Sequence, residues 1–307
     1  MKKIFLIHDD LMGFFPKRKE KYNIFLICDK SKLKHYFRRL LQLFGISPYL
    51  FLFNKKWIRR LKKVDEIIIF DGERVIDLVN AIQKKYPHKK IVVWYWNPVK
   101  KAVVKPEELI GKVNSIWTYD PFDAKKYNLK LNTQFYFKEE LEVSANEYSK
   151  LERRYDVFFI GADKGRENEL KKYASIFKQQ NISYYLHLTK YGYSDKESDT
   201  YKSPINYPTV IKYVRNCKAI LELKNDSVQE GLSLRPLEAL FFKKKLLTNN
   251  QSIINSKVYD PKNIFILGVD DIKQLPIFLD GDYSISQNYD SLVKYYSFNS
   301  WAKRFEE

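Results

Sequence analysis

The sequence has few of the residues that build covalent frameworks and metal centres. Only two of its 307 residues are cysteines, which is too few for a disulfide framework and fits a reducing cytoplasm. The four histidines are scattered, so their spacing predicts no metal cluster. No apolar run reaches the roughly 18–20 residues that span a bilayer, and the apolar run at the start is too short for a signal peptide. We therefore expect a soluble or peripheral protein.

One motif that holds phosphates is also missing. The spacing Gly-x4-Gly-Lys-Ser/Thr of the Walker A loop does not occur. Asp9 and Asp10 are adjacent, and neighbours at the end of a strand point to opposite sides. This pair therefore does not predict a metal site.

Positive charge is what the sequence has in abundance. The chain carries 55 lysines and arginines against 37 acidic residues, which gives a formal net charge of +18. Such a charge predicts attraction to polyanions or to anionic membrane surfaces. A hydrophobic content of 45% and a length of 307 residues are enough for two globular domains, each with its own core.

Short apolar runs alternate with helical patterns along both halves of the chain, and this alternation predicts parallel sheets covered by helices. The strands expected in the first half are Ile4–Ile7, Asn23–Cys28, Glu66–Phe70, Ile91–Tyr95 and Ser115–Thr118. Those expected in the second half are Tyr155–Ile160, Ser183–Leu188, Ala219–Leu223, Lys245–Thr248 and Asn263–Leu267. The fold class is therefore α/β, with two Rossmann-like domains.

Polar residues follow the strands of the first half. In parallel sheets, ligands bind beyond the carboxyl ends of the strands, and these positions are His8, Asp9, Asp10, Asp71, Trp96, Asn97 and Asp120. In the second half, the turn Gly161–Arg166 follows a strand and opens a helix, so its backbone and the cations Lys164 and Arg166 can hold phosphate oxygens. The alternative is a surface turn with two solvated cations.

The stretch Ser31–Phe44 is predicted to be an amphipathic helix. Its apolar stripe is Leu33, Tyr36, Phe37, Leu40, Leu41 and Phe44, and its basic residues occupy the other face. Aromatics and further lysines and arginines follow up to Lys63. Two interpretations stay open: an interface with anionic lipid, or an ordinary helix that packs on the sheet with a solvated basic face.

A loop-to-helix junction lies at Gln229–Gly231, between the expected strands Ala219–Leu223 and Lys245–Thr248. Such a junction suits an anion such as phosphate, and Gly231 lets the backbone come close to it. Glu230 and Glu238 lie eight residues apart, about two helical turns, so both can face one ligand. Arg235 is interpreted as a phosphate clamp or a bridge to Glu238. The alternative for the whole segment is an ordinary βαβ unit with two solvated glutamates.

These residues carry a resemblance. Glu230-x7-Glu238, with Gly231 after the first glutamate and Ala239 after the second, resembles the donor-binding motif of glycosyltransferases of the GT-B architecture. The string Gln-Glu-Gly-Leu-Ser-Leu-Arg-Pro-Leu-Glu-Ala-Leu looks more like that of bacterial glycosyltransferases of lipopolysaccharide-core or capsule biosynthesis. It differs from the common pattern at Ser233, where glycine is usual, and at Arg235, inside the helix.

The resemblance implies a donor site and an architecture. Glu230 would contact the donor sugar, the backbone at Gly231 would meet the diphosphate, and Glu238 would bind the ribose hydroxyls. Gly161, Lys164, Arg166 and Arg235 would hold the diphosphate, so we expect neither a metal nor a cofactor. Two Rossmann-like domains would enclose a cleft, and a C-terminal helix would cross back to the first domain.

The acid–base chemistry stays open. If the reaction inverts, a base must take the acceptor proton, and the candidates are His8, Asp9, Asp10 and Asp120 of the first domain. Asp120 has an alternative role as the cap of a turn stabilised by Pro121. If the reaction retains configuration, no dedicated base is needed and Glu230 assists the donor sugar.

We therefore expect an acceptor domain (1–137), a linker (138–154), a donor domain (155–286) and a closing helix (287–307). The predicted function is sugar transfer from a nucleotide-sugar to a glycan or lipid-linked acceptor in bacterial surface polysaccharide biosynthesis. The expected location is the cytoplasm, including the inner face of the plasma membrane, with no nucleic-acid partner. The rival is a non-catalytic binder of RNA or another polyanion, although no RNA-binding signature is visible.

Overall fold

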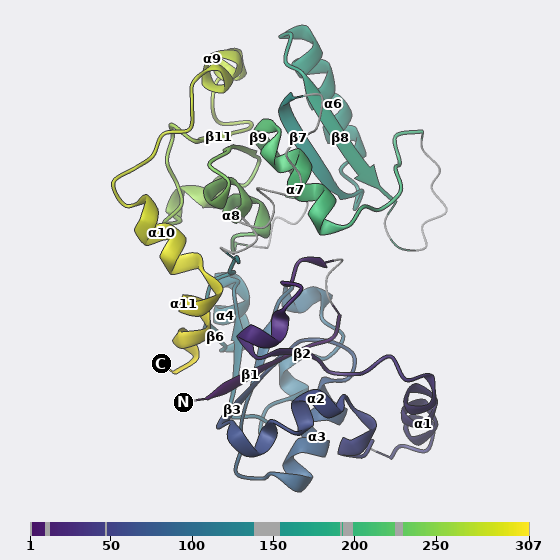
Figure 1. The fold of residues 1–307 in the computed structure, drawn as a ribbon. Coiled ribbons are helices and arrows are strands. Elements are labelled where there is room, and N and C mark those ends of the chain that lie inside the picture. The colour runs from purple at the N-terminus through teal and green to yellow at the C-terminus, as the bar shows by residue number, and fades with distance from the viewer. Residues whose placement is uncertain are drawn as a thin grey trace. The chain divides into compact units, whose positions relative to one another are not determined.

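The computed structural model describes residues 2–9, 13–46, 48–137, 154–190, 192, 199–224 and 230–306. The chain divides into two compact units. The first comprises Met1–Leu11 and Phe15–Thr133, and the second comprises Met12–Phe14 and Gln134–Glu307. Each unit contains one parallel β-sheet with helices packed against it (Figure 1).

The first unit has a six-stranded parallel sheet in the order β2-β1-β3-β4-β5-β6. Its strands are β1 (Lys3–Ile7), β2 (Ile24–Leu26), β3 (Glu66–Phe70), β4 (Lys90–Tyr95), β5 (Ser115–Thr118) and β6 (Lys130–Leu131). The two central strands β3 and β4 are apolar and almost wholly buried, as in sheets covered on both faces. Strand β6, which the sequence did not predict, is a two-residue edge with exposed side chains and so leaves no apolar signal.

The helices of the first unit are α1 (Lys32–Leu43), α2 (Lys55–Ile58), α3 (Val75–Lys85) and α4 (Pro121–Tyr127). Helix α3 buries Val75, Leu78, Val79, Ala81 and Ile82. Helix α4 begins at a proline, and the Asp120 side chain accepts the backbone N–H groups of Phe122 and Asp123, so it caps the helix.

Helix α1 turns two of its basic side chains, Lys34 and Arg38, toward the protein, unlike an ordinary surface helix. Arg38 is only 2% exposed, and its guanidinium donates to the carbonyl of Leu52. The Lys34 ammonium donates to the carbonyl of Phe53 at 2.8 Å. Leu33 and Phe44 of the apolar stripe are 67% and 72% exposed. The interpretation of α1 as a helix packed on the sheet by its apolar stripe is therefore wrong, because the backbone carbonyls of residues 52–53 hold Lys34 and Arg38 and most of the stripe is exposed.

The second unit has a five-stranded parallel sheet in the order β11-β10-β9-β7-β8. Its strands are β7 (Tyr155–Ala162), β8 (Tyr184–Thr189), β9 (Cys217–Glu222), β10 (Lys245–Thr248) and β11 (Ile264–Ile266). Its helices are α6 (Glu167–Gln179), α7 (Tyr207–Arg215), α8 (Leu234–Phe241), α9 (Leu275–Asp280), α10 (Tyr289–Tyr296) and α11 (Phe298–Lys303). The predicted α/β class with two parallel sheets is confirmed.

An aromatic cluster joins distant parts of the chain within the second unit. Phe14, from near the start of the chain, packs on Phe135 and Tyr207 with ring centroids 6.2 and 5.2 Å apart. Phe135 also packs on Trp301 at 4.3 Å. The predicted closing helix is two helices, because the Ser297 side chain accepts the N–H of Ser300 and starts α11 afresh.

No helix in the part of the chain that the structure describes is long and apolar enough to cross a membrane. Of the predicted linker, 138–154, only Arg154 lies among the described residues.

Candidate functional site

The strand order of the second unit reverses between β7 and β9, because β8 continues the sheet on one side of β7 and β10 continues it beyond β9. In open α/β sheets, ligands bind beyond the carboxyl ends of the strands at such a point. Gly161 lies near the end of β7, Glu222 ends β9, and α8 follows β9 in the chain. Most of the predicted donor-binding residues are therefore on elements that meet at this switch point.

The guanidinium of Arg166 lies against the backbone of Gly161. A Cβ added at Gly161 would be 2.9 Å from Nη1 of Arg166, closer than real Cβ atoms come to other atoms. The lack of a side chain at Gly161 thus leaves room for this close approach. The Arg166 guanidinium also lies 6.0 Å from the ring centroid of Phe159.

Two arginines come together at this edge. Burial lowers the pKa of Arg166 most, and the positive charge of Arg235 lowers it further, whereas Glu222 and Asp163 act in the other direction. The buried Nε of Arg166 has no hydrogen-bond partner among the described residues. A pair of guanidinium groups with an unused donor is an arrangement that suits an anion with several oxygens.

The turn that carries Lys164 is fixed by Asp163. The Asp163 carboxylate accepts the backbone N–H of Glu167 at 2.9 Å and the hydroxyl of Tyr201 at 2.9 Å. Lys164 has a φ of 45° and Gly165 a φ of 85°, so both are in the left-handed region. The predicted turn into a helix is confirmed, with α6 beginning at Glu167.

Glu238 lies in a buried network. It is 1% exposed, its Oε2 pairs with the guanidinium of Arg235, and its Oε1 accepts the hydroxyl of Tyr207 at 3.2 Å. The Tyr207 hydroxyl also hydrogen-bonds to that of Tyr136. Burial raises the pKa of Glu238, against the effect of Arg235. Of the two roles predicted for Arg235, the structure shows the bridge to Glu238, and its Nη2 also donates to the carbonyl of Ile160 at 3.3 Å.

Glu222 is a site residue that the sequence analysis missed. Its carboxylate accepts the Thr248 hydroxyl at 2.7 Å and the Ser233 hydroxyl at 2.5 Å. Ser233 in turn caps α8 by accepting the N–H of Arg235 at 3.1 Å. The signal was a lone carboxylate within the apolar run Ala-Ile-Leu-Glu-Leu, at the end of a buried strand. Ser233 and Glu222 together fix where α8 begins.

Glu230 and Glu238 do not share a helix, so the predicted separation of two helical turns is wrong, while the expectation that both face one ligand stays a prediction. Helix α8 begins at Leu234 because Ser233 caps it, and Glu230 comes four residues earlier. The Glu230 side chain is exposed, whereas Glu238 is buried. Gly231, which follows Glu230 in the sequence, is also buried. Their predicted roles toward the sugar and the ribose stay predictions.

The sheet of the first unit also reverses its order, between β1 and β3. His8 follows β1 and is largely buried, and burial lowers its pKa. A Cβ added at Gly72, just after β3, would lie 2.4 Å from Nε2 of His8, so the imidazole fills the space above this glycine. Asp9 follows His8, and Asp10 lies outside the described residues. Asp120 is buried and engaged as the cap of α4.

Burial raises the pKa of Asp71 to about 6, although its carboxylate accepts the N–H of Trp96 at 2.7 Å. When the pKa of a carboxyl is higher in the folded than in the unfolded protein, the unfolding free energy falls as the pH rises from the unfolded-state pKa to the folded-state pKa. We expect the unfolding free energy of Asp71→Asn, relative to the unchanged protein, to increase by about 2–3 kcal/mol between pH 4 and pH 7. Urea titrations across this range measure the difference.

Asp29 provides the control, because its pKa is shifted the other way. Burial alone would raise the pKa of Asp29, but the hydrogen bond from Lys34 at 2.7 Å and neighbouring charges lower it. Below the ordinary pKa value of 3.8, the unfolding free energy of Asp29→Asn, relative to the unchanged protein, should therefore decrease as the pH rises, and between pH 4 and pH 7 it should stay nearly constant. A difference for Asp71→Asn that is the same at pH 4 and pH 7 would contradict the assignment.

Within the described ranges, no group of three or more histidine, cysteine, aspartate or glutamate side chains is placed to hold a metal ion. The expected independence of a metal stays a prediction.

No protein-family model matches this sequence, and no curated protein matches it either. Solved structures do resemble it. The apo form of the lipopolysaccharide outer core galactosyltransferase WaaB is 13% identical, with a TM-score of 0.51 over 100% of this chain and 98% of that one. AviGT4, a glycosyltransferase of avilamycin A biosynthesis, is 10% identical, with a TM-score of 0.58 over 100% and 96%.

A third similar structure is an alpha-glucosyltransferase in complex with UDP and a 13-mer DNA. It is 11% identical, with a TM-score of 0.54 over 100% of this chain and 96% of that one. At these identities the likeness concerns the fold alone. The chain has the two-domain α/β fold of GT-B glycosyltransferases.

Proposed function

We propose that the protein is a glycosyltransferase that moves a sugar from a nucleotide-sugar to a glycan or lipid-linked acceptor in bacterial surface polysaccharide biosynthesis. The observation that carries this proposal is the pair Arg166 and Arg235 at the switch point of the second sheet, beside the capped start of α8. One protein of similar fold was solved with UDP, and another is named a lipopolysaccharide galactosyltransferase.

The chemistry requires cations at this place. In the transfer, the bond between the anomeric carbon and the diphosphate oxygen breaks, and the acceptor oxygen bonds to that carbon and loses its proton. About two negative charges develop on the departing diphosphate. Arg166, the guanidinium of Arg235 and the N–H groups at the start of α8 would stabilise them without a metal ion, because they are already oriented before the reaction.

A ligand panel tests the proposal. We would measure the thermal shift caused by UDP, GDP, CMP and dTDP and by their common sugar conjugates, on the unchanged protein, on Arg166→Met and on Lys178→Met. Lys178 is exposed on α6, so its replacement changes the net charge equally. Stabilisation by one nucleotide that only Arg166→Met abolishes would support the donor site. No shift with any nucleotide at millimolar concentration would overturn it.

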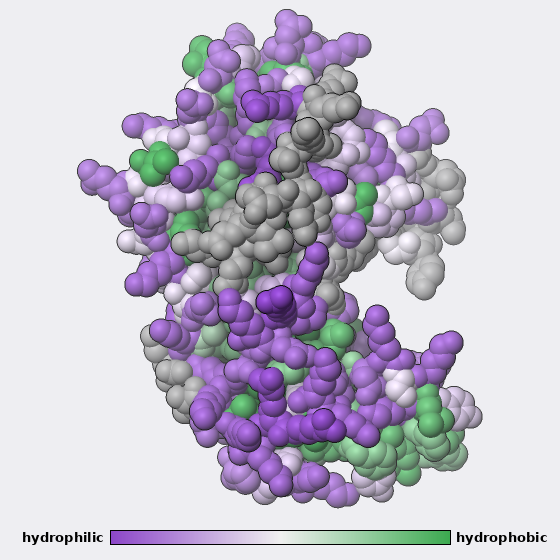
Figure 2. All heavy atoms as spheres, viewed as in Figure 1, coloured by the Kyte–Doolittle hydropathy of each residue, from purple (hydrophilic) through white to green (hydrophobic). Residues whose placement is uncertain are grey.

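We also propose that the first unit binds an anionic membrane surface through the outward face of α1 and the segment that follows. This face comprises Leu33, Tyr36, Phe37, Leu43, Phe44, Ile46, Tyr49 and Phe51, all exposed. Figure 2 shows apolar side chains gathered over α1. An exposed apolar surface of this size marks an interaction site. Lys32, Arg39, Lys84 and Lys85 are exposed on or near the same surface and would meet anionic headgroups.

A pocket of about 690 Å³ adjoins this face. Its walls include Ile46, Tyr49 and Phe51, and Lys84 lies 5.5 Å from the ring centroid of Tyr49. The apolar walls suit the start of a lipid chain, and the neighbouring lysines suit its anionic headgroup. This pocket supports a lipid-linked acceptor over a free glycan.

Replacing Leu33, Phe37 and Phe44 by serine should weaken binding to vesicles of phosphatidylglycerol and phosphatidylcholine at least about tenfold, because each exposed apolar side chain contributes roughly 1.5–3 kcal/mol when buried. Flotation assays measure the bound fraction. The control replaces Val269, Ile277 and Ile285, which are similarly exposed in the second unit, by serine. Equal losses in both triple variants, or binding to neutral vesicles alone, would contradict the proposal.

The rival function is a polyanion binder, which the net charge of +18 favours. A protein that binds RNA through counterion release loses affinity steeply with salt, whereas nucleotide binding at Arg166 should depend on the base. Salt-sensitive RNA binding together with an empty ligand panel would favour the rival.

A further inference from the structure

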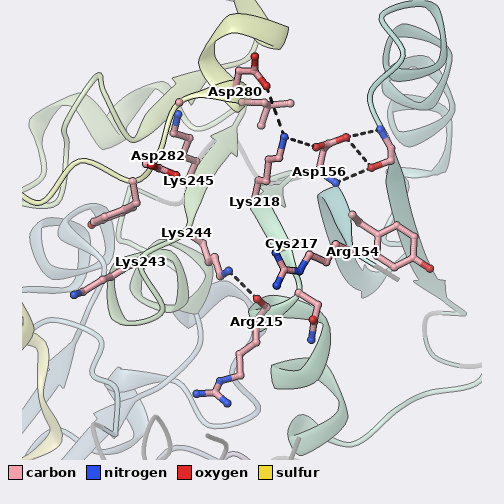
Figure 3. Close-up of a pocket in the computed structure, with 16 residues that line it drawn as sticks. Arg154, Asp156, Arg215, Cys217, Lys218, Lys243, Lys244, Lys245, Asp280 and Asp282 are labelled. Carbon is pink, nitrogen blue, oxygen red and sulfur yellow. Dashed lines mark hydrogen bonds and ion pairs between the residues drawn. The ribbon is translucent and has the colours of Figure 1, made fainter. Parts of the chain in front are cut away.

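A second pocket lies at the opposite edge of the second sheet. Its volume is about 460 Å³, and it opens at the amino ends of β7, β9 and β10, where Tyr155, Cys217 and Lys245 begin these strands (Figure 3). Arg166 and Arg235 lie beyond the carboxyl ends of the strands, and neither of them lines this pocket. The inference that follows does not depend on the proposed glycosyl transfer.

One end of this pocket is cationic. Lys244 donates from Nζ to the carbonyl of Arg215 at 2.8 Å. Burial lowers the pKa of Lys244 most, and the positive charges of Arg154 and Arg215 lower it further, although Cys217 acts against them. Neither Lys244 nor Arg154 has an ion-pair partner within the described ranges. Folding thus brings three cations together, and none of the described carboxylates forms an ion pair with Lys244.

The other end of the pocket carries three carboxylates together with Lys218 and Lys245. Lys218 bridges Asp156 at 2.9 Å and Asp280 at 3.9 Å, and Asp282 lies near Lys245. Figure 3 shows these three carboxylates on one side of the pocket and Arg154, Arg215 and Lys244 on the other. The pocket therefore has a cationic end and an end that also offers carboxylate oxygens as acceptors.

We propose that this pocket binds a phosphorylated sugar. Its phosphate group would lie among Arg154, Arg215 and Lys244, since a doubly charged anion with three oxygens matches two guanidinium groups and an ammonium. Its hydroxyl groups would donate to Asp280 and Asp282, because carboxylates accept several hydrogen bonds. A volume of about 460 Å³ is within the range of small-molecule sites. A recessed pocket with acidic residues at one end fits such a molecule better than a nucleic-acid backbone.

Isothermal titration with D-glucose 6-phosphate, inorganic phosphate and D-glucose tests the proposal. We expect glucose 6-phosphate to bind, phosphate to bind more weakly and glucose not to bind. Lys244→Met and Arg154→Gln should each weaken glucose 6-phosphate binding at least about tenfold, since each removes a charged hydrogen bond to phosphate. Lys178→Met, which loses the same charge from the exposed surface of α6, should leave the affinity unchanged.

Arg166→Met separates this pocket from the donor site. It should leave glucose 6-phosphate binding unchanged while it abolishes any nucleotide binding. If Arg166→Met abolishes binding of glucose 6-phosphate and Lys244→Met does not, the ligand occupies the other edge of the sheet and the proposal is wrong. The absence of measurable binding at about 10 mM glucose 6-phosphate would also overturn the proposal.

A covalent label gives a second readout on the unchanged protein. Pyridoxal 5′-phosphate carries a phosphate and an aldehyde, so its aldehyde condenses with a nearby lysine amine, water leaves, and borohydride reduces the imine to a stable amine. Mass spectrometry should find label at Lys243, Lys244 or Lys245 that glucose 6-phosphate prevents. Label at these lysines that glucose 6-phosphate leaves unchanged would contradict the proposal.

Discussion

Replacing Arg235 by methionine is expected to lower the unfolding free energy by about 3–5 kcal/mol at pH 7. The reason is that Glu238 is 1% exposed and has this guanidinium as its counter-ion. Without it, the buried carboxylate keeps, among the described residues, the hydroxyl of Tyr207 at 3.2 Å alone, so it must either stay charged in an apolar surrounding or take up a proton. Urea unfolding followed by circular dichroism measures the loss.

The double variant Arg235→Met/Glu238→Gln is the matched control. A neutral amide at residue 238 needs no counter-ion and can still accept from Tyr207, so the double variant should regain most of the lost stability. Arg39→Met, an exposed position on α1, should change the unfolding free energy by less than about 0.5 kcal/mol. A loss for Arg235→Met of under 1 kcal/mol, or no recovery in the double variant, would show that the pair is not what holds Glu238.

Replacing Arg166 by methionine should lower kcat/KM for the donor by about 100- to 1,000-fold, the usual effect of removing one oriented group that stabilises transition-state charge. Arg166 suits such a role because it lies against Gly161 and has a buried Nε without a hydrogen-bond partner among the described residues. Methionine keeps an unbranched side chain over Phe159, so the fold should be little affected. Release of nucleoside diphosphate from the donor that the ligand panel identifies measures the rate.

The pattern of losses separates a phosphate contact from a structural role. Arg166→Met should unfold at the same urea concentration as Lys178→Met while it loses activity. If the two variants retain equal activity, Arg166 does not contact the donor. If Arg166→Met unfolds much earlier, the arginine supports the turn after β7 instead.

Much of the fold could be predicted because the central strands of both sheets are short, apolar and largely buried. Runs such as Glu66–Phe70 and Lys245–Thr248 are given by the sequence with the bounds that the structure has. Strand β6 could not be predicted, since Lys130 and Leu131 are exposed and their pairing depends on β5. The pattern predicts the loop-to-helix junction at Gln229–Gly231, which is too early, because the hydroxyl of Ser233 caps α8 and the helix begins at Leu234.

Side-chain orientation and long-range partners were the harder part of the prediction. Periodicity shows that α1 has an apolar stripe, but not that Arg38 turns inward to the Leu52 carbonyl and leaves this stripe exposed. The spacing of Arg235 and Glu238 allowed their bridge to be foreseen. Tyr136 and Tyr207 complete that network from distant segments, and nothing local marks them.

The position of Phe14 has a consequence for the way the chain is made. This residue leaves the ribosome early, yet its ring packs among Phe135, Tyr136, Phe137 and Tyr207 of the second unit. The nascent chain must therefore keep an apolar segment unburied until α7 has been synthesised, even after the strands of the first sheet have paired. A gene fragment that starts at Gln134 would lack this ring. Its product would expose the aromatic side chains that Phe14 otherwise covers, and exposed apolar surface promotes aggregation.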